Sequence, residues 1–229
     1  MRYAVLGPGQ RLRPMLALRV ARVLGNPENP ARTAGAAIEI LHCASLIVDD
    51  LPCMDNDEMR RNRPAVHVEF GEATAVLAAF ALVALAARVV AAFPAFQIKL
   101  LNTLDCNQLI QGQSLDLELT GISRDEQRPL VTDLKTVPLF ELAIHAGLLS
   151  SRAGSDHSQA VLSFGHEFGS AYQVLDDYLD GEITDSAPVD QQFSRARACL
   201  QVFGSEAYPL EELLDHLNGK IFETNRSHR

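Results

Sequence analysis

Almost every long segment of the chain carries apolar residues at the spacing of an α-helix. Between residues 32 and 48, for example, Ile38, Leu41, Ala44 and Val48 form one apolar stripe. No segment alternates apolar and polar residues as a half-buried β-strand requires, and no repeat of fixed period is present. The sequence therefore predicts an all-α, single-domain helical bundle over residues 1–229. The expected helices span 14–24, 32–48, 69–93, 96–119, 130–151, 158–179, 191–204 and 209–222, with a loop at 120–129.

Charge and cysteine usage exclude several classes of partner. The chain has 20 Lys and Arg against 29 Asp and Glu, a formal charge of −9, which argues against a nucleic-acid partner. The four cysteines show no C-x-x-C spacing, so neither a disulfide framework nor a zinc site is expected. We therefore expect reduced thiols and a cytoplasmic location.

The segment 73–93 is long and apolar enough to resemble a membrane span. Arg88 interrupts it, however, and alanine dominates where leucine and isoleucine would be expected. We expect a central helix that is buried on nearly all sides, and no transmembrane segment.

Two acidic clusters lie at the C-terminal ends of predicted helices. In the first, LIVDDLPCMDNDEMRR, the carboxylates Asp49, Asp50 and Asp55 follow an apolar run and are followed by Arg60 and Arg61. Helix C-termini are unfavourable for anions because their carbonyls point outward, so carboxylates placed there gain most by binding a cation. Since a proline lies between the aspartates, the chain must bulge for Asp55 to return to the face of Asp49.

The second cluster, YQVLDDYLD, places Asp176 and Asp180 four residues apart, within about 40° on one helix face. Asp177 flanks them. Carboxylate oxygens are the ligands of a hard cation such as Mg²⁺, which completes its shell with water and phosphate oxygens, and arginines grip phosphate with planar forks. Either cluster alone would also fit a solvated helix end. Together they indicate a diphosphate site.

These clusters belong to a series of motifs that resembles the trans-isoprenyl diphosphate synthases, the short-chain polyprenyl synthase family. The matching blocks, in the family's order and rough spacing, are GQRLRP (9–14), DDLPCMDNDEMRR (49–61), GQSLDL (112–117), KT (135–136) and GHEFGSAYQVLDDYLD (165–180). The resemblance implies an isoprenoid synthase fold, a helical bundle around a central apolar cavity. It also implies a homodimer.

The resemblance assigns a role to each matching residue. The implied Mg²⁺ ligands, facing each other across the cavity, are Asp49, Asp50, Asp55, Asp176, Asp177 and Asp180. The implied contacts of the allylic diphosphate are Arg60 and Lys135. The implied site for isopentenyl diphosphate comprises Arg13, His42, Arg61 and, in the position of a family lysine, Gln10. Thr136 and Gln173 match residues that face the developing cation. Gln113 belongs to a matching block and is either a substrate contact or a link between helices.

The reaction that the resemblance implies is the Mg²⁺-dependent, head-to-tail condensation of isopentenyl diphosphate with dimethylallyl, geranyl or farnesyl diphosphate. The growing tail runs along the helices, so side chains about one turn before the first aspartates form its floor. Relatives with an aromatic residue at the fifth position before the aspartates tend to stop at fifteen carbons. Ala44 holds that position here and Ser45 follows it, both small, so the resemblance favours the twenty-carbon geranylgeranyl product over the fifteen-carbon farnesyl product. Phe80 is the residue of the neighbouring helix that could shorten the tube.

Several departures from the family pattern leave alternatives open. Gln10 replaces a lysine, and GEITDSAPVDQQ after Asp180 lacks the family's lysine-bearing loop. The first motif also comes early, so we expect an N-terminal helix and that loop to be missing. The alternative is a non-catalytic or weakly active subunit that modifies a partner synthase. A terpene cyclase is a third possibility, although such enzymes usually carry an Asn/Ser/Glu metal motif in place of a second aspartate cluster.

Overall fold

The structure is a computed structural model, and it describes residues 1–104, 109–118 and 132–227. Its elements confirm the predicted all-α class, since the two strands have two residues each and pair with each other. The predicted loop at 120–129 lies outside the described residues. The elements are α1 (Arg2–Val5), α2 (Leu12–Val23), α3 (Glu28–Asp49), β1 (Met59–Arg60), β2 (Arg63–Pro64), α4 (Val66–Phe70), α5 (Glu72–Val89), α6 (Pro94–Leu104), α7 (Leu109–Glu118), the π-helical turn η1 (Thr132–Thr136), α9 (Val137–Gly147), α10 (Ser155–Leu179), α11 (Ala187–Ala198), the 3₁₀ segment η2 (Gln201–Ala207) and α12 (Tyr208–Ser227).

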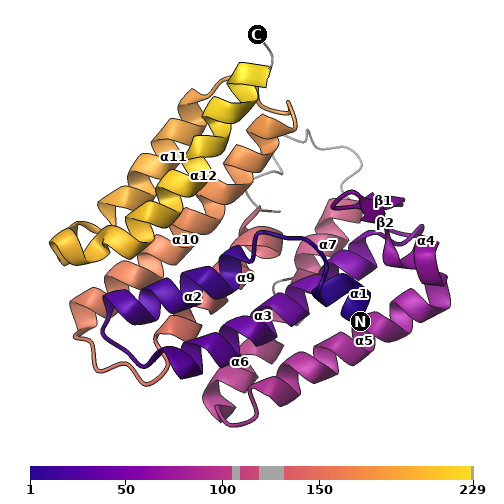
Figure 1. Ribbon diagram of the computed structural model, residues 1–229, viewed down its shortest axis with the longest axis horizontal. Helices are drawn as coiled ribbons and strands as arrows, with labels where there is room; N and C mark the ends of the chain where they lie inside the picture. The colour runs from indigo at the N-terminus through magenta and orange to yellow at the C-terminus, as the bar shows by residue number, and fades with distance from the viewer. Residues whose placement is uncertain (105–108, 119–131, 228–229) are drawn as a thin grey trace.

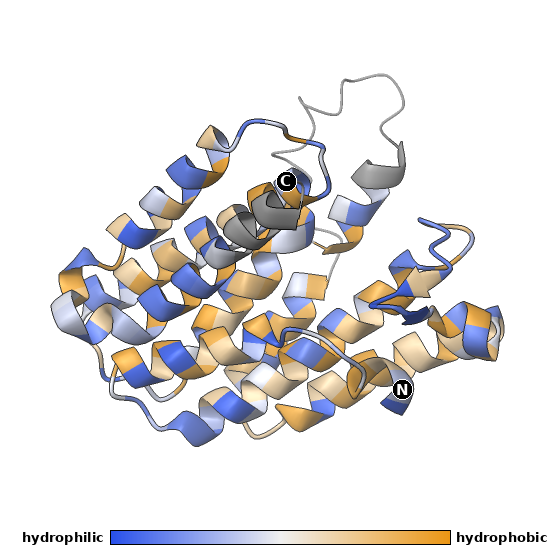
Figure 2. Cartoon of the chain, turned by 45° about the horizontal axis from the view of Figure 1, so that its top comes forward, coloured by the Kyte–Doolittle hydropathy of each residue, from blue (hydrophilic) through white to orange (hydrophobic). Residues whose placement is uncertain are grey.

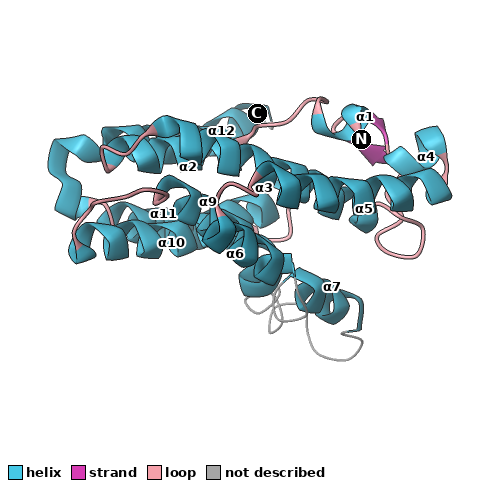
Figure 3. Cartoon of the chain, turned by 90° about the horizontal axis from the view of Figure 1, so that it is seen from below, coloured by secondary structure: helices cyan, strands magenta, loops and turns pink. Residues whose placement is uncertain are grey.

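The long helices lie in two layers. Seen edge on in Figure 3, α2, α3 and α5 lie in one layer, with α10, α9 and α6 in the layer beneath. Helices α10, α11 and α12 lie side by side at one end of the molecule (Figure 1). Most helices carry hydrophilic residues on one face and hydrophobic residues on the other (Figure 2), which is the pattern that packs such layers.

Helix α9 forms the centre of the bundle. Nearly all of its residues are buried, and it packs against α2, α3 and α10. Phe140 in this helix makes edge-on contact with Phe168, their ring centroids 5.3 Å apart, and also contacts Tyr172. These ring contacts hold the N-terminal end of α9 beside the C-terminal half of α10.

Helix α5 was predicted as the buried central helix, and that prediction is wrong. The predicted segment 69–93 is divided at Gly71, whose φ of 84° ends α4 and precedes α5. Helix α5 buries only an alanine-rich face against α3, while Leu77 and Phe80 are 69% and 70% exposed. Small alanines let the α3 and α5 backbones approach closely. The apolar residues of α5 therefore lie on both its buried face and its exposed face.

By length and composition alone, α3 and α5 could each cross a membrane. The core helices of soluble proteins satisfy the same criterion, and more than half of the apolar window of α3 is buried within this fold. The absence of a transmembrane segment stays a prediction.

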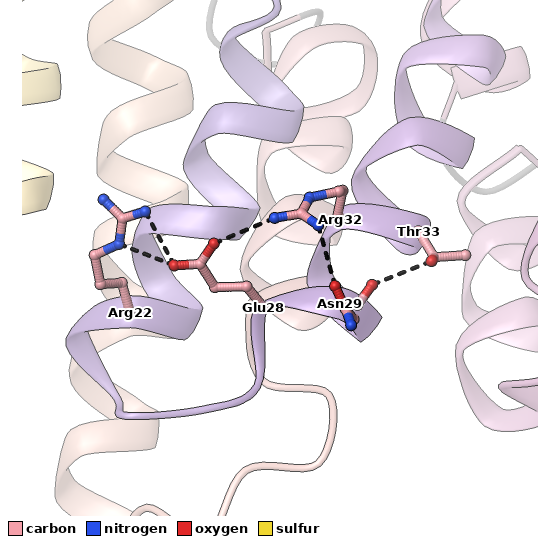
Figure 4. Close-up of polar contacts among 5 residues, drawn as sticks. All are labelled: Arg22, Glu28, Asn29, Arg32 and Thr33. Atoms are coloured by element: carbon pink, nitrogen blue, oxygen red, sulfur yellow. Dashed lines mark hydrogen bonds and ion pairs between the residues drawn. The ribbon is translucent and has the colours of Figure 1, made fainter.

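An exposed polar network holds the start of α3 near the end of α2 (Figure 4). The Glu28 carboxylate accepts hydrogen bonds from Arg22 Nε (3.1 Å) and Nη2 (3.0 Å) and from Arg32 Nη2 (3.5 Å). Arg32 also donates to the Asn29 side chain, and the Thr33 hydroxyl donates to the Asn29 carbonyl. Because the charges are exposed, we expect each pair to contribute no more than about 0.5 kcal/mol, so the network mainly fixes the turn.

The crossing of α2 and α9 depends on a glycine. A Cβ at Gly147 would lie 2.6 Å from Val20 Cβ and 2.8 Å from the Ala17 carbonyl oxygen. We therefore expect Gly147→Ala to lower the free energy of unfolding by about 1–3 kcal/mol, because the two backbones must move apart. The matched control is Gly154→Ala, where the added methyl meets nothing within 4 Å. Urea denaturation of both variants checks this, and equal midpoints for the two would contradict it.

Candidate active site

One large cavity, about 1130 Å³, opens between the two layers. Its polar part is lined by ends of α2, α3, η1 and α10, and its apolar part by α5, α7 and the middle of α3. All of the predicted site residues line it except Asp50 and Asp177. Those lining it are Gln10, Arg13, His42, Ala44, Ser45, Asp49, Asp55, Arg60, Arg61, Phe80, Gln113, Lys135, Thr136, Gln173, Asp176 and Asp180.

The bulge expected in the first acidic cluster is confirmed. Helix α3 ends at Asp49, and the chain then turns back so that the Asp55 amide donates to the Asp49 carbonyl at 2.9 Å. Asn56 completes the turn with a left-handed φ of 55°. Asp49 and Asp55 therefore both line the cavity although they are six residues apart.

The second acidic cluster lies on the opposite wall, at the end of α10. Asp176 and Asp180 are one helical turn apart, with the Asp180 amide donating to the Asp176 carbonyl at 2.9 Å, and both line the cavity. Asp177 points into the protein and is only 7% exposed. Its Oδ1 accepts a hydrogen bond from Gln173 Nε2 at 2.8 Å.

Asp50 also points away from the cavity, and it pairs with an arginine. It is 2% exposed, and its Oδ1 accepts from Arg60 Nε at 2.8 Å and Nη2 at 2.5 Å. Arg60 Nη2 donates as well to Asp57 Oδ2 at 2.7 Å. Burial raises the pKa of Asp50, and the hydrogen bonds from Arg60 oppose that shift. Asp50 therefore holds the guanidinium of Arg60 at the cavity wall.

The carboxylates that line the cavity form two pairs, not one cluster. Among residues 1–104, 109–118 and 132–227, no three His, Cys, Asp or Glu side chains are grouped closely enough to hold a metal ion by themselves. Mg²⁺ usually keeps several waters and takes phosphate oxygens, so it needs only one or two carboxylates on each side. The two facing pairs therefore fit Mg²⁺ together with a phosphorylated ligand between them.

Burial raises the pKa of Asp49 to about 6, an effect opposed by the Lys135 charge and increased by Asp55. A proton therefore competes with a cation for Asp49 below about pH 6. We expect the dissociation constant for Mg²⁺ alone to be constant above pH 7 and to rise up to about tenfold per pH unit below pH 6. Calorimetric titration from pH 5 to 8 checks this. The same slope in Asp49→Asn would contradict it.

Cationic side chains gather on the wall formed by α2 and α3, where Arg13 and Arg61 both line the cavity. Arg13 is 8% exposed, its guanidinium lies 4.5 Å from the centroid of the Phe140 ring, and its buried Nε has no hydrogen-bond partner among the described residues. Burial, together with Arg13 and Arg61, lowers the pKa of His42 well below its ordinary value, so this imidazole is neutral. A buried cation beside a neutral donor is suited to an anionic ligand.

Arg11 does not supply the charge that Gln10 lacks. Its guanidinium donates to Glu39 Oε1 at 2.9 Å and to the carbonyls of Val5 (2.7 Å) and Gly7 (2.6 Å). Glu39 is a buried acid that the sequence reasoning missed. A charged residue one turn before His42 on an otherwise apolar face was the signal that could have revealed it.

Polar groups near the start of α9 also face the cavity. The turn η1 brings both Lys135 and Thr136 to the cavity wall, and such π-helical turns are frequent at functional sites. Thr136 Oγ1 donates to Gln173 Oε1 at 2.7 Å. The amide of Gln113 has a buried nitrogen and a buried oxygen without partners among the described residues, which suits it to a bound polar ligand.

The apolar part of the cavity begins about one turn before the first aspartates. Ala44 is 2% exposed and lines it, and the Ser45 hydroxyl donates to the His42 carbonyl at 2.9 Å. Phe80 lines the cavity from α5, while most of its surface remains exposed. Tyr172, also missed from the sequence, lines the wall next to Gln173.

Comparisons with known proteins agree with this geometry. A family model described as polyprenyl synthetase matches residues 1–188. A geranylgeranyl diphosphate synthase from Pantoea ananas is 35% identical over 228 residues, which cover 95% of this chain and 75% of that protein. The mitochondrial geranylgeranyl pyrophosphate synthase 10 of Arabidopsis thaliana is 37% identical over 193 residues. The aligned residues cover 79% of this chain and 56% of the relative, so the chain spans about half the length of that protein. The crystal structure of a geranyltransferase from Legionella pneumophila has a TM-score of 0.88 and 29% identity, covering 100% of this chain and 86% of that one.

Proposed function

Because the chain belongs to the polyprenyl synthetase family, we propose that it condenses isopentenyl diphosphate with an allylic diphosphate to form an all-trans prenyl diphosphate. The observation that carries this proposal is the pairing of carboxylates on opposite walls of a cavity whose other end is apolar. Asp49 and Asp55 face the cavity from one side, and Asp176 and Asp180 from the other. A diphosphate with an isoprenoid tail matches both ends of this cavity.

In the proposed reaction the bond between the allylic carbon and the diphosphate oxygen breaks, and the diphosphate leaves with the electron pair. The double bond of isopentenyl diphosphate attacks the allylic cation, and a proton then leaves to the released diphosphate. Mg²⁺ held by the two carboxylate pairs would neutralise the charge of the leaving group. Arg60 and Lys135 bind the same diphosphate from the cavity wall.

The remaining residues orient the second substrate and exclude water. Arg13, Arg61 and the neutral His42 bind the diphosphate of isopentenyl diphosphate on the wall of α2 and α3. The oxygen atoms of Thr136 and Gln173 face the allylic cation. The apolar part of the cavity shields that cation from water, and the small side chain of Ala44 leaves room for a twenty-carbon product.

We also propose a homodimer that covers the exposed face of α5 and α6. Leu77 and Phe80 on α5, together with Ile98 and Leu101 on α6, are large apolar side chains that are exposed in the single chain. Exposed large apolar side chains on two consecutive helices are candidates for burial in a protein interface.

The diphosphate released from geranyl diphosphate tests the reaction class. With Mg²⁺, we expect release only when isopentenyl diphosphate is also present, and none without the metal. Release from geranyl diphosphate alone would indicate a cyclase instead. No release under any condition, combined with intact Mg²⁺-dependent diphosphate binding, would favour the non-catalytic subunit.

The alternative of a non-catalytic subunit is supported by one residue of the cavity wall, Gln10. Gln10 lines the cavity where the family carries a lysine, and the neighbouring Arg11 already donates a hydrogen bond to the Glu39 carboxylate. For an active synthase we expect Gln10→Lys to lower the KM for isopentenyl diphosphate about tenfold with little change in kcat, because it adds a charge worth about 1.4 kcal/mol on phosphate. Steady-state kinetics against the uncharged control Gln10→Met measures this. An unchanged KM would show that the cationic wall needs no further charge.

A further inference from the structure

Asp177 was predicted as a metal ligand, and its surroundings indicate a different role. We propose that Asp177 is a positioning residue, which orients the side chains of Gln173 and Thr136 toward the allylic cation. This inference rests on the proposed function. It changes the assignment of one carboxylate in the second acidic cluster from the metal to the cation-facing wall.

A chain of hydrogen bonds joins the three residues. Thr136 Oγ1 donates to Gln173 Oε1 at 2.7 Å, and Gln173 Nε2 donates to Asp177 Oδ1 at 2.8 Å. Gln173 and Asp177 are one turn apart on α10, while Thr136 directly precedes α9. Thr136 and Gln173 line the cavity and Asp177 lies behind them. The chain therefore runs from the buried interior to the cavity wall.

The carboxylate of Asp177 fixes which end of the Gln173 amide faces Thr136. A carboxylate only accepts hydrogen bonds, so the NH₂ group of the amide must point toward it and the carbonyl oxygen must point away. That carbonyl then accepts the Thr136 hydroxyl proton, which leaves the lone pairs of the hydroxyl oxygen available to the cavity. With the amide reversed, an NH₂ group would meet Thr136 and the wall would present positive hydrogens.

This orientation suits a reaction that develops positive charge. Dipoles fixed in advance with their negative ends toward a cation stabilise it without reorganisation, and in a cavity with apolar walls they act at low dielectric. Asp176 and Asp180 lie on the cavity side of the same helix. Consecutive residues on a helix point about 100° apart, so Asp177 cannot share the direction of Asp176. In the second acidic cluster, Asp176 and Asp180 thus face the cavity, while Asp177 orients the Gln173 amide.

Substitutions at Asp177 separate the two roles, because an asparagine can still accept a hydrogen bond from Gln173 but is a poor ligand for Mg²⁺. We expect Asp177→Ala to lower kcat about 30-fold with the KM of both substrates unchanged, and Asp177→Asn to lower it only about threefold. Calorimetric titration of Mg²⁺ with inorganic diphosphate should give nearly wild-type affinity for both variants. Asp176→Asn is the matched control, and it should lose at least tenfold in that affinity.

A double-mutant cycle provides the second measurement. If Asp177 acts through the Gln173 amide, Asp177→Ala should lower kcat no more than about threefold in a Gln173→Ala background. Two results would overturn the inference. The first is a loss of Mg²⁺–diphosphate affinity in Asp177→Asn that equals the loss in Asp176→Asn. The second is a double variant, Asp177→Ala with Gln173→Ala, whose fold-loss of kcat equals the product of the losses of the two single variants. Circular dichroism confirms that each variant is folded. If the wild-type protein forms no prenyl product, that result would instead contradict the proposed function, and with it this inference.

Discussion

Asp49→Asn should make the metal-free protein more stable while abolishing its activity. We expect kcat to fall at least about 1000-fold, because the substitution removes a carboxylate that, in the proposed reaction, acts with Asp55 on the leaving diphosphate. The free energy of unfolding at pH 7.5 should rise by about 1–3 kcal/mol, because burial raises the pKa of Asp49 and its negative charge is therefore unfavourable in the folded state.

The pH dependence follows from the direction of that pKa shift. The pKa of Asp49 is raised from 3.8 to about 6 in the folded chain. Between pH 3.8 and pH 6 the folded chain therefore keeps a proton on Asp49 that the unfolded chain has lost. The penalty of the charged carboxylate is complete above pH 6 and disappears below the unfolded value of 3.8. The stability gain of Asp49→Asn should therefore fall to about half at pH 5.

Urea denaturation at pH 7.5 and pH 5, without metal, measures this gain. Asp190→Asn is a suitable control because Asp190 is an exposed aspartate in the first turn of α11. We expect its stability to change by no more than about 0.5 kcal/mol at either pH. An Asp49→Asn variant that is less stable than the wild type at pH 7.5 would contradict the inference that the buried charge of Asp49 destabilises the metal-free fold.

Ala44→Phe should change the product from twenty carbons to fifteen. A phenyl group at this buried position fills the apolar part of the cavity about one turn beyond Asp49. We expect the rate with farnesyl diphosphate as primer to fall at least about 100-fold, because its tail no longer fits, while the rate with dimethylallyl diphosphate stays within about threefold. Chromatographic sizing of the products from each primer measures both quantities.

Phe80→Ala is the matched variant on the facing helix. Since Phe80 lines the same part of the cavity from α5, its removal should leave the twenty-carbon product or lengthen it by one unit. A twenty-carbon product from Ala44→Phe would mean that the tail takes another path. A shorter product from Phe80→Ala would mean that this side chain supports the tail and does not limit it.

The helices and the two acidic clusters were predictable because both depend on local sequence. Apolar spacing sets where a helix forms, and the proline after Asp49 requires a bulge wherever the chain lies in the fold. The same spacing predicted α10 closely, from Ser155 to Leu179 in the structure. The cavity lining likewise contains nearly all of the residues that the motif resemblance selected.

The directions of neighbouring carboxylates were not predictable. Asp49 and Asp50, like Asp176 and Asp177, are adjacent in sequence, and only the rotation of each helix in the bundle decides which one faces the cavity. That rotation is set by packing against several neighbouring helices, α2, α5 and α9 for α3 and α9 and α11 for α10, which no single segment encodes. The burial of α5 was misjudged for a similar reason: its apolar residues include an exposed face, and hydrophobicity alone cannot distinguish a core contact from an interface.

The incorporation of labelled isopentenyl diphosphate tests the central claim most directly. Purified protein with Mg²⁺ is incubated separately with dimethylallyl, geranyl and farnesyl diphosphate, and the labelled products are sized. We predict a twenty-carbon prenyl diphosphate from all three primers. No labelled prenyl product from any primer, while Mg²⁺-dependent diphosphate binding remains intact, would contradict the assignment as a synthase.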